Sequence, residues 1–133
     1  MVRWPARLQP RRDDKSLVST IDIAPTILAA CGLTPASEMR GINLLDVASS
    51  KAAHGAVFGE IYEHDVADID RAEPGLLFRW CIAGDWKLIE SADGKKRELY
   101  NVSADPAEEK DLAAANPQRV NELAAKIQAA WKP

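Results

Sequence analysis

The sequence has 133 residues, with 17 Lys and Arg against 20 Asp and Glu and a formal net charge of −3. Its length suits a globular domain, and 47% hydrophobic with 28% charged residues excludes a disordered chain. No apolar run approaches the roughly 20 residues that a membrane-spanning helix needs, and the mild acidity argues against a nucleic-acid-binding face. We therefore expect a folded domain that binds neither membrane nor nucleic acid.

The start of the chain predicts a short strand at residues 1–5, followed by a polar loop. Pro5 ends the strand because proline cannot donate a ladder hydrogen bond. The apolar stretch of a signal peptide is missing here, so we expect no export signal in this sequence.

A helix is predicted to begin at Asp22, whose carboxylate is suited to accept the free amide protons of the first turn. Pro25 falls within that turn, where a missing N–H costs little, and Gly32 is suited to end the helix. Its apolar positions recur at helical spacing and predict a face that packs on a core: Ala24, Ile27, Leu28 and Cys31. Residues 33–53 are predicted to form a surface loop held down by the apolar side chains within 41–45.

The remainder predicts a small antiparallel sheet. Residues 56–62 have strand composition, and an acidic, irregular loop follows from 64 to 74. A three-stranded meander then follows, with strands at 77–83, 86–90 and 97–101.

A terminal helix is predicted from Asn116-Pro117, an N-cap followed by proline at the first helical position. Its apolar stripe is typical of a helix that covers a sheet: Val120, Leu123, Ala124, Ile127, Ala130 and Trp131. The fold class is therefore α+β, a meander plus one further strand packed by a C-terminal amphipathic helix.

Side chains on the strands are expected to divide between core and solvent. Three basic residues are predicted to face outward: Arg79, Lys87 and Arg97. The aromatic residues are predicted to join the core between sheet and helix: Phe78, Trp80, Trp86 and Trp131.

Common catalytic and metal-binding signatures are missing from the sequence. An acidic stretch could offer oxygen ligands to a hard cation: Glu63, Asp65, Asp68, Asp70 and Glu73. It lacks the order of an EF-hand, so we expect a solvated loop and predict no catalytic and no metal-binding residue. Cys31 and Cys81 are expected to be buried free thiols, although a disulfide between them stays open.

Several stretches resemble the C-terminal portion of the sulfatase family, within the alkaline phosphatase-like superfamily. The resemblance spans essentially the whole chain. Its strongest parts are the following: 18–28 (Val-Ser-Thr-Ile-Asp-Ile-Ala-Pro-Thr-Ile-Leu), 40–45 (Arg-Gly-Ile-Asn-Leu-Leu), 98–101 (Glu-Leu-Tyr-Asn) and 105–113 (Asp-Pro-Ala-Glu-Glu-Lys-Asp-Leu-Ala). Two positions depart from the family pattern, Ala6 in place of glycine and Asp111 in place of asparagine.

The resemblance implies a parent sulfuric ester hydrolase with a formylglycine nucleophile and a calcium ion. In that family the nucleophile and the metal ligands precede the matched region. Neither Cys31 nor Cys81 fits the Cys-x-Pro-Ser-Arg modification motif. The resemblance thus implies no catalytic residue and no cofactor in this chain, with residues 1–50 at the edge of the α/β catalytic domain and 51–133 as the C-terminal subdomain.

The resemblance also implies partners, because apolar faces that cover a larger sheet are left open here. We expect a homodimer or an N-terminal sulfatase polypeptide, with a sulfated substrate only in the assembled enzyme. His64 is the candidate for the rim of the substrate cleft. A stand-alone binding or regulatory module and one half of a split enzyme stay open as alternatives. Many relatives are periplasmic or secreted, and the compartment of this chain stays open.

Overall fold

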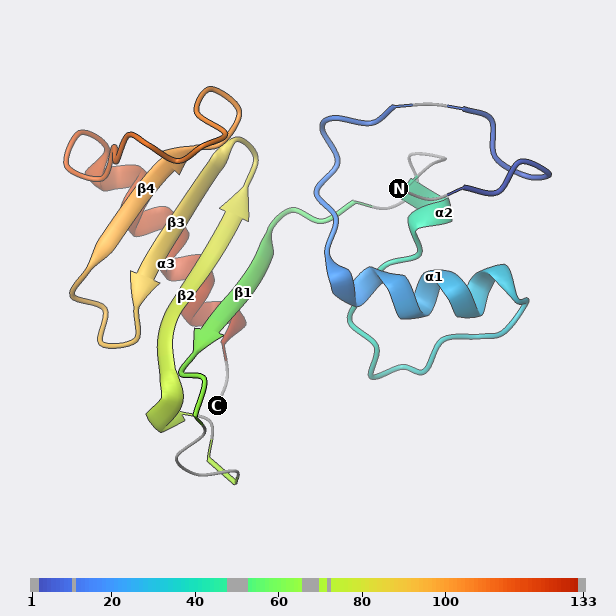
Figure 1. Cartoon of the computed structure of the whole chain (residues 1–133), viewed down its shortest axis with the longest axis horizontal. Coiled ribbons are helices and arrows are strands. Elements are labelled where there is room, and N and C mark those ends of the chain that lie inside the picture. The colour runs from blue at the N-terminus through green and yellow to red at the C-terminus, as the bar shows by residue number, and fades with distance from the viewer. Residues whose placement is uncertain (1–2, 11, 48–52, 66–69, 72, 132–133) are drawn as a thin grey trace. The chain divides into compact units, whose positions relative to one another are not determined.

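The computed structural model describes residues 3–10, 12–47, 53–65, 70–71 and 73–131. The chain forms two compact units, Met1–Ala53 and His54–Pro133 (Figure 1). None of the described helices is long and apolar enough to cross a membrane.

The first unit is built around three short helices, η1 (Thr20–Asp22), α1 (Ile23–Ala30) and α2 (Leu44–Val47). The predicted end of α1 is confirmed. Gly32 has a φ of +75°, and the Leu33 amide donates to the Leu28 carbonyl at 2.9 Å. This left-handed cap satisfies carbonyls that the helix would otherwise leave open. In the described part of the loop predicted over 33–53, one helix is found that the sequence did not indicate, α2.

The strand expected at residues 1–5 is not found in its described part, since a turn begins at Pro5. Met1 and Val2 lie outside the described residues. A strand forms only when it can hydrogen-bond to a neighbouring strand. The described residues of the first unit contain no strand that could pair with it.

The predicted burial of α1 is wrong for this chain. Of the helix residues predicted to face a core, Ala24 and Ile27 are exposed, Ile27 at 57%, and Leu28 is half-buried. Ile23 on the same helix is 53% exposed, and the buried residues of α1 are Pro25 and Thr26. Cys31, expected to be buried, is exposed as well. The helical spacing predicts an apolar face, but few of the described residues of the first unit are buried.

The second unit is a four-stranded antiparallel sheet in the order β1-β2-β3-β4. Its strands are β1 (Val57–Tyr62), β2 (Leu76–Ala83), β3 (Trp86–Ser91) and β4 (Arg97–Asn101). The helix α3 (Pro117–Ala130) crosses one face, and a short helix, η2 (Glu73–Gly75), precedes β2 (Figure 1). The predicted α+β class is confirmed.

The core of this unit lies between the sheet and α3. One row of side chains crosses β2, β3 and β4 through Cys81, Leu88 and Leu99, all fully buried. The stripe of α3 packs on this row through Val120, Leu123, Ala124 and Ile127. Ala130, the next position of the predicted stripe, is exposed.

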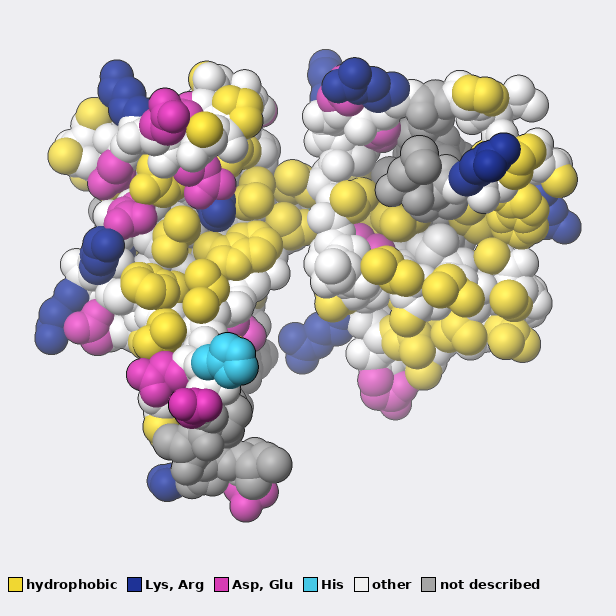
Figure 2. Space-filling view, in the orientation of Figure 1, with side chains coloured by type: hydrophobic (Ala, Val, Ile, Leu, Met, Phe, Trp, Pro, Cys, Tyr) yellow, Lys and Arg dark blue, Asp and Glu magenta, His cyan; other side chains and the backbone are white. Residues whose placement is uncertain are grey.

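The other face of the sheet carries Phe78 and Trp80, which corrects their expected place in the core. Side chains alternate along a strand, so Trp80 and Phe78 point away from the face that Cys81 turns toward α3. Trp86 does pack against the core, as expected. Figure 2, in which α3 lies behind the sheet, shows hydrophobic side chains gathered over the open face.

Candidate functional site

The Asp22 segment, the first stretch resembling a sulfatase, holds the backbone of a distant loop. The Asp22 carboxylate is fully buried and accepts hydrogen bonds from the Ser19 amide at 2.7 Å and the Ile42 amide at 2.8 Å. It makes no capping bond to α1, contrary to prediction, because η1 precedes α1 and gives Asp22 helical backbone angles.

Thr26 extends this contact by one turn. Its hydroxyl donates to the Asp22 carbonyl at 2.6 Å and accepts from the Leu44 amide at 2.9 Å. The residue at position 41 must be glycine, because a Cβ there would collide with the backbone of Ile21 and Asp22. The side chains of Asp22 and Thr26 thus hold the backbone of the 41–45 loop. The apolar side chains predicted to hold it, Ile42, Leu44 and Leu45, are half-buried. We call Asp22, Thr26, Gly41, Ile42 and Leu44 the loop clasp.

Another stretch that resembles sulfatases, residues 105–113, lies along the free edge of β4 and hydrogen-bonds to it. The Asp111 carboxylate accepts from the Leu99 amide at 3.0 Å, and the Leu112 amide donates to the Leu99 carbonyl at 2.8 Å. The Asp105 carboxylate accepts from the Lys110 amide at 2.9 Å, and this bond lowers the pKa of Asp105. Asp105 therefore holds the backbone within this loop, whereas Asp111 joins the loop to β4.

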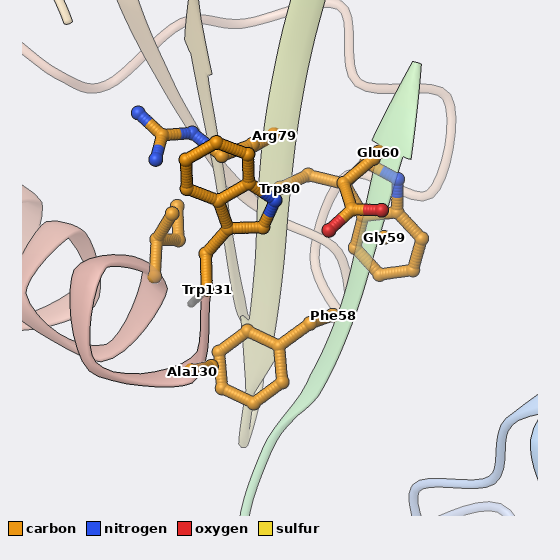
Figure 3. Close-up of a pocket in the computed structure, with 8 residues that line it drawn as sticks. Phe58, Gly59, Glu60, Arg79, Trp80, Ala130 and Trp131 are labelled. Carbon is orange, nitrogen blue, oxygen red and sulfur yellow. The ribbon is translucent and has the colours of Figure 1, made fainter. Parts of the chain in front are cut away.

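A shallow pocket lies where the C-terminal end of α3 meets β1 and β2 (Figure 3). Its volume is about 40 Å³, room for roughly three water molecules. The guanidinium of Arg79 lies 4.9 Å from the centre of the Trp131 ring, and Glu60 and Phe58 line the β1 side. The pocket offers aromatic surface, a cation and a carboxylate, but no serine, threonine or cysteine nucleophile lines it.

Arg79 belongs to a charge row that sequence reasoning missed. Glu90, only 1% exposed, lies between the Arg79 Nη2 at 3.3 Å and the Arg97 Nε at 2.8 Å. All three face α3, whereas Lys87 lies on the open face and binds Glu108 at 2.7 Å. The predicted outward basic face is therefore wrong. Arginines two strands apart, opposite one glutamate, are the signal that could have revealed the row.

His64, the sequence candidate for a cleft rim, is exposed just beyond the end of β1. Of the acidic loop, Glu63, Asp65 and Asp70 are exposed, Glu73 begins η2, and Asp68 lies outside the described residues.

The described residues do not fit the calcium ion or the formylglycine that the sulfatase resemblance implies. Within them, no three His, Cys, Asp or Glu side chains form a group that could hold a metal ion. Both cysteines are free thiols, and burial raises the pKa of Cys81 to about 11. No reaction step can be derived from these side chains.

Comparison with known families places the chain among sulfatase C-terminal regions. The family "N-sulphoglucosamine sulphohydrolase, C-terminal" matches residues 1–132. An N-acetylgalactosamine-6-O-sulfatase from Bacteroides thetaiotaomicron is 30% identical over 92% of this chain, which is 25% of that protein. The chain thus spans about a quarter of the length of the curated relatives it matches.

Solved structures agree in fold. A sulfatase described as putative from Bacteroides fragilis has a TM-score of 0.73 at 15% identity, covering 95% of this chain and 27% of its own. A phosphonate monoester hydrolase from Agrobacterium radiobacter has a TM-score of 0.62 at 22% identity, covering 81% of this chain and 23% of its own. These identities support the fold alone.

Proposed function

The chain belongs to the N-sulphoglucosamine sulphohydrolase C-terminal family, and we propose that it acts as the C-terminal part of a sulfatase. In this role it supports the fold and shapes the wall of the substrate cleft, and it supplies no catalytic group. Alone, it does not hydrolyse sulfate esters.

This proposal rests on the hydrogen bonds that the carboxylates of the sulfatase-like motifs make. The carboxylates of Asp22 and Asp105 accept backbone amide protons from loop residues, and that of Asp111 accepts one from Leu99 in β4. A group that acts in catalysis must reach substrate or a reacting atom. Carboxylates occupied in this way stabilise loops, so the motifs that link this chain to sulfatases are structural in it.

The partner we propose is an N-terminal sulfatase polypeptide, which would bring the formylglycine and the calcium ion. In the matched relatives this region is about a quarter of the protein, and the proposed partner would correspond to the other three quarters. The exposed α1 stripe of Ile23 and Ile27 supports it too, because a helix with such a stripe needs a surface to cover. The substrate of the assembled enzyme would be a sulfate ester.

His64 is our candidate for the substrate side of this assembly. It is exposed and lies two residues after Tyr62, the last residue of β1. In the assembled enzyme, His64→Ala should raise KM by about tenfold with little change in kcat, the size of one lost hydrogen bond to substrate. His54→Ala, at the only other histidine, is the control. An unchanged KM would remove His64 from the cleft.

The main test is a sulfate-ester assay on the purified chain, with and without added calcium. We expect no sulfate release above the uncatalysed rate, because an activated nucleophile and charge stabilisation are both required. Calcium-dependent release that persists through further purification would contradict the proposal.

Two alternatives use the same chain differently. One is a stand-alone binding or regulatory module, and the other is one half of a split sulfatase. Sequencing the DNA upstream of the coding region separates them. A reading frame that encodes Cys-x-Pro-Ser-Arg would favour the split enzyme or a longer single chain, whereas its absence would favour the module.

A further inference from the structure

We draw no further inference here: the strongest candidate, the apolar face of the sheet opposite α3, which carries Phe78 and Trp80 of β2, supports none because nothing in the described part of the structure shows what covers it.

Discussion

At the scale of single residues, Gly59 and Trp80 pack closely across two strands of the sheet. The two residues are paired between β1 and β2, and the indole occupies the space that a side chain at position 59 would need. A glycine in a strand usually weakens it, and here the large neighbouring ring covers the exposed backbone.

Gly59→Ala should therefore destabilise the protein by about 1 to 3 kcal/mol, the usual range for overpacking. The Cβ would meet the Cζ2, Cε2 and Nε1 atoms of Trp80 and force the ring off the strand. Urea unfolding measures the change. Gly55→Ala is the matched control, because nothing lies within 4 Å of a Cβ there. Equal stabilities for the two variants would contradict this packing.

The two cysteines should differ sharply in reactivity. Cys31 is exposed, whereas Cys81 is buried and its pKa is raised to about 11 by burial. Only the thiolate reacts in disulfide exchange, so an aromatic disulfide reagent at about pH 8 should label one thiol quickly and the second only after unfolding. Cys31→Ser should abolish the fast phase. Rapid labelling of Cys81 in the folded chain would show that its strand opens readily.

At the scale of elements, the loop clasp ties α1 to the segment before α2 through few hydrogen bonds. Thr26→Val keeps the shape of the side chain but leaves the Leu44 amide without its acceptor. The expected loss of stability is about 1 kcal/mol, the lower end of the cost of an unsatisfied donor, because the Leu44 amide is only part-buried. Hydrogen exchange at Leu44 should accelerate accordingly.

Thr34→Val is the control for this change, because Thr34 is exposed beyond the end of α1. It should alter neither stability nor the exchange at Leu44. Unchanged exchange at Leu44 in Thr26→Val would show that the Thr26 hydroxyl contributes nothing to holding the loop.

The glycines at the turns and the spacing of apolar residues explain why the helices and strands of the second unit were predictable. Gly84 and Gly94 both have positive φ values and stand where the hairpins turn, so β2, β3 and β4 begin and end within a residue of prediction. The face of each side chain was harder to predict. Alternation shows that Trp80 and Cys81 point to opposite sides, but only the position of α3 decides which side is the core.

The candidate site was predictable only in part, for a related reason. The motif residues Asp22 and Asp111 were recognisable in the sequence, yet their partners Ile42 and Leu99 lie 20 and 12 residues away. Backbone amides leave no pattern in the sequence, so a carboxylate that binds them cannot be told from one that binds a substrate. The sequence likewise cannot show whether His64 contacts a substrate, so its role at the cleft rim stays a prediction.

At the scale of the whole molecule, the two units differ in how much they bury. The second has a core of seven buried residues between the sheet and α3. In the described part of the first, the buried residues are Asp22, Pro25 and Thr26, and its longest helix has 8 residues. A helix of that length needs tertiary packing to be stable. We therefore expect the first unit to depend on contacts outside itself.

Separate expression of residues 54–133 and residues 1–53 tests this difference. We expect the second piece to unfold cooperatively in urea, followed by the fluorescence of Trp80, Trp86 and Trp131, because its core is complete. The first piece, followed by Trp4, should show no cooperative transition, because so little of it is buried. Cooperative unfolding of 1–53 alone would mean that the exposed α1 stripe needs no cover. Failure of 54–133 to fold would instead mean that the open face of its sheet must be covered first.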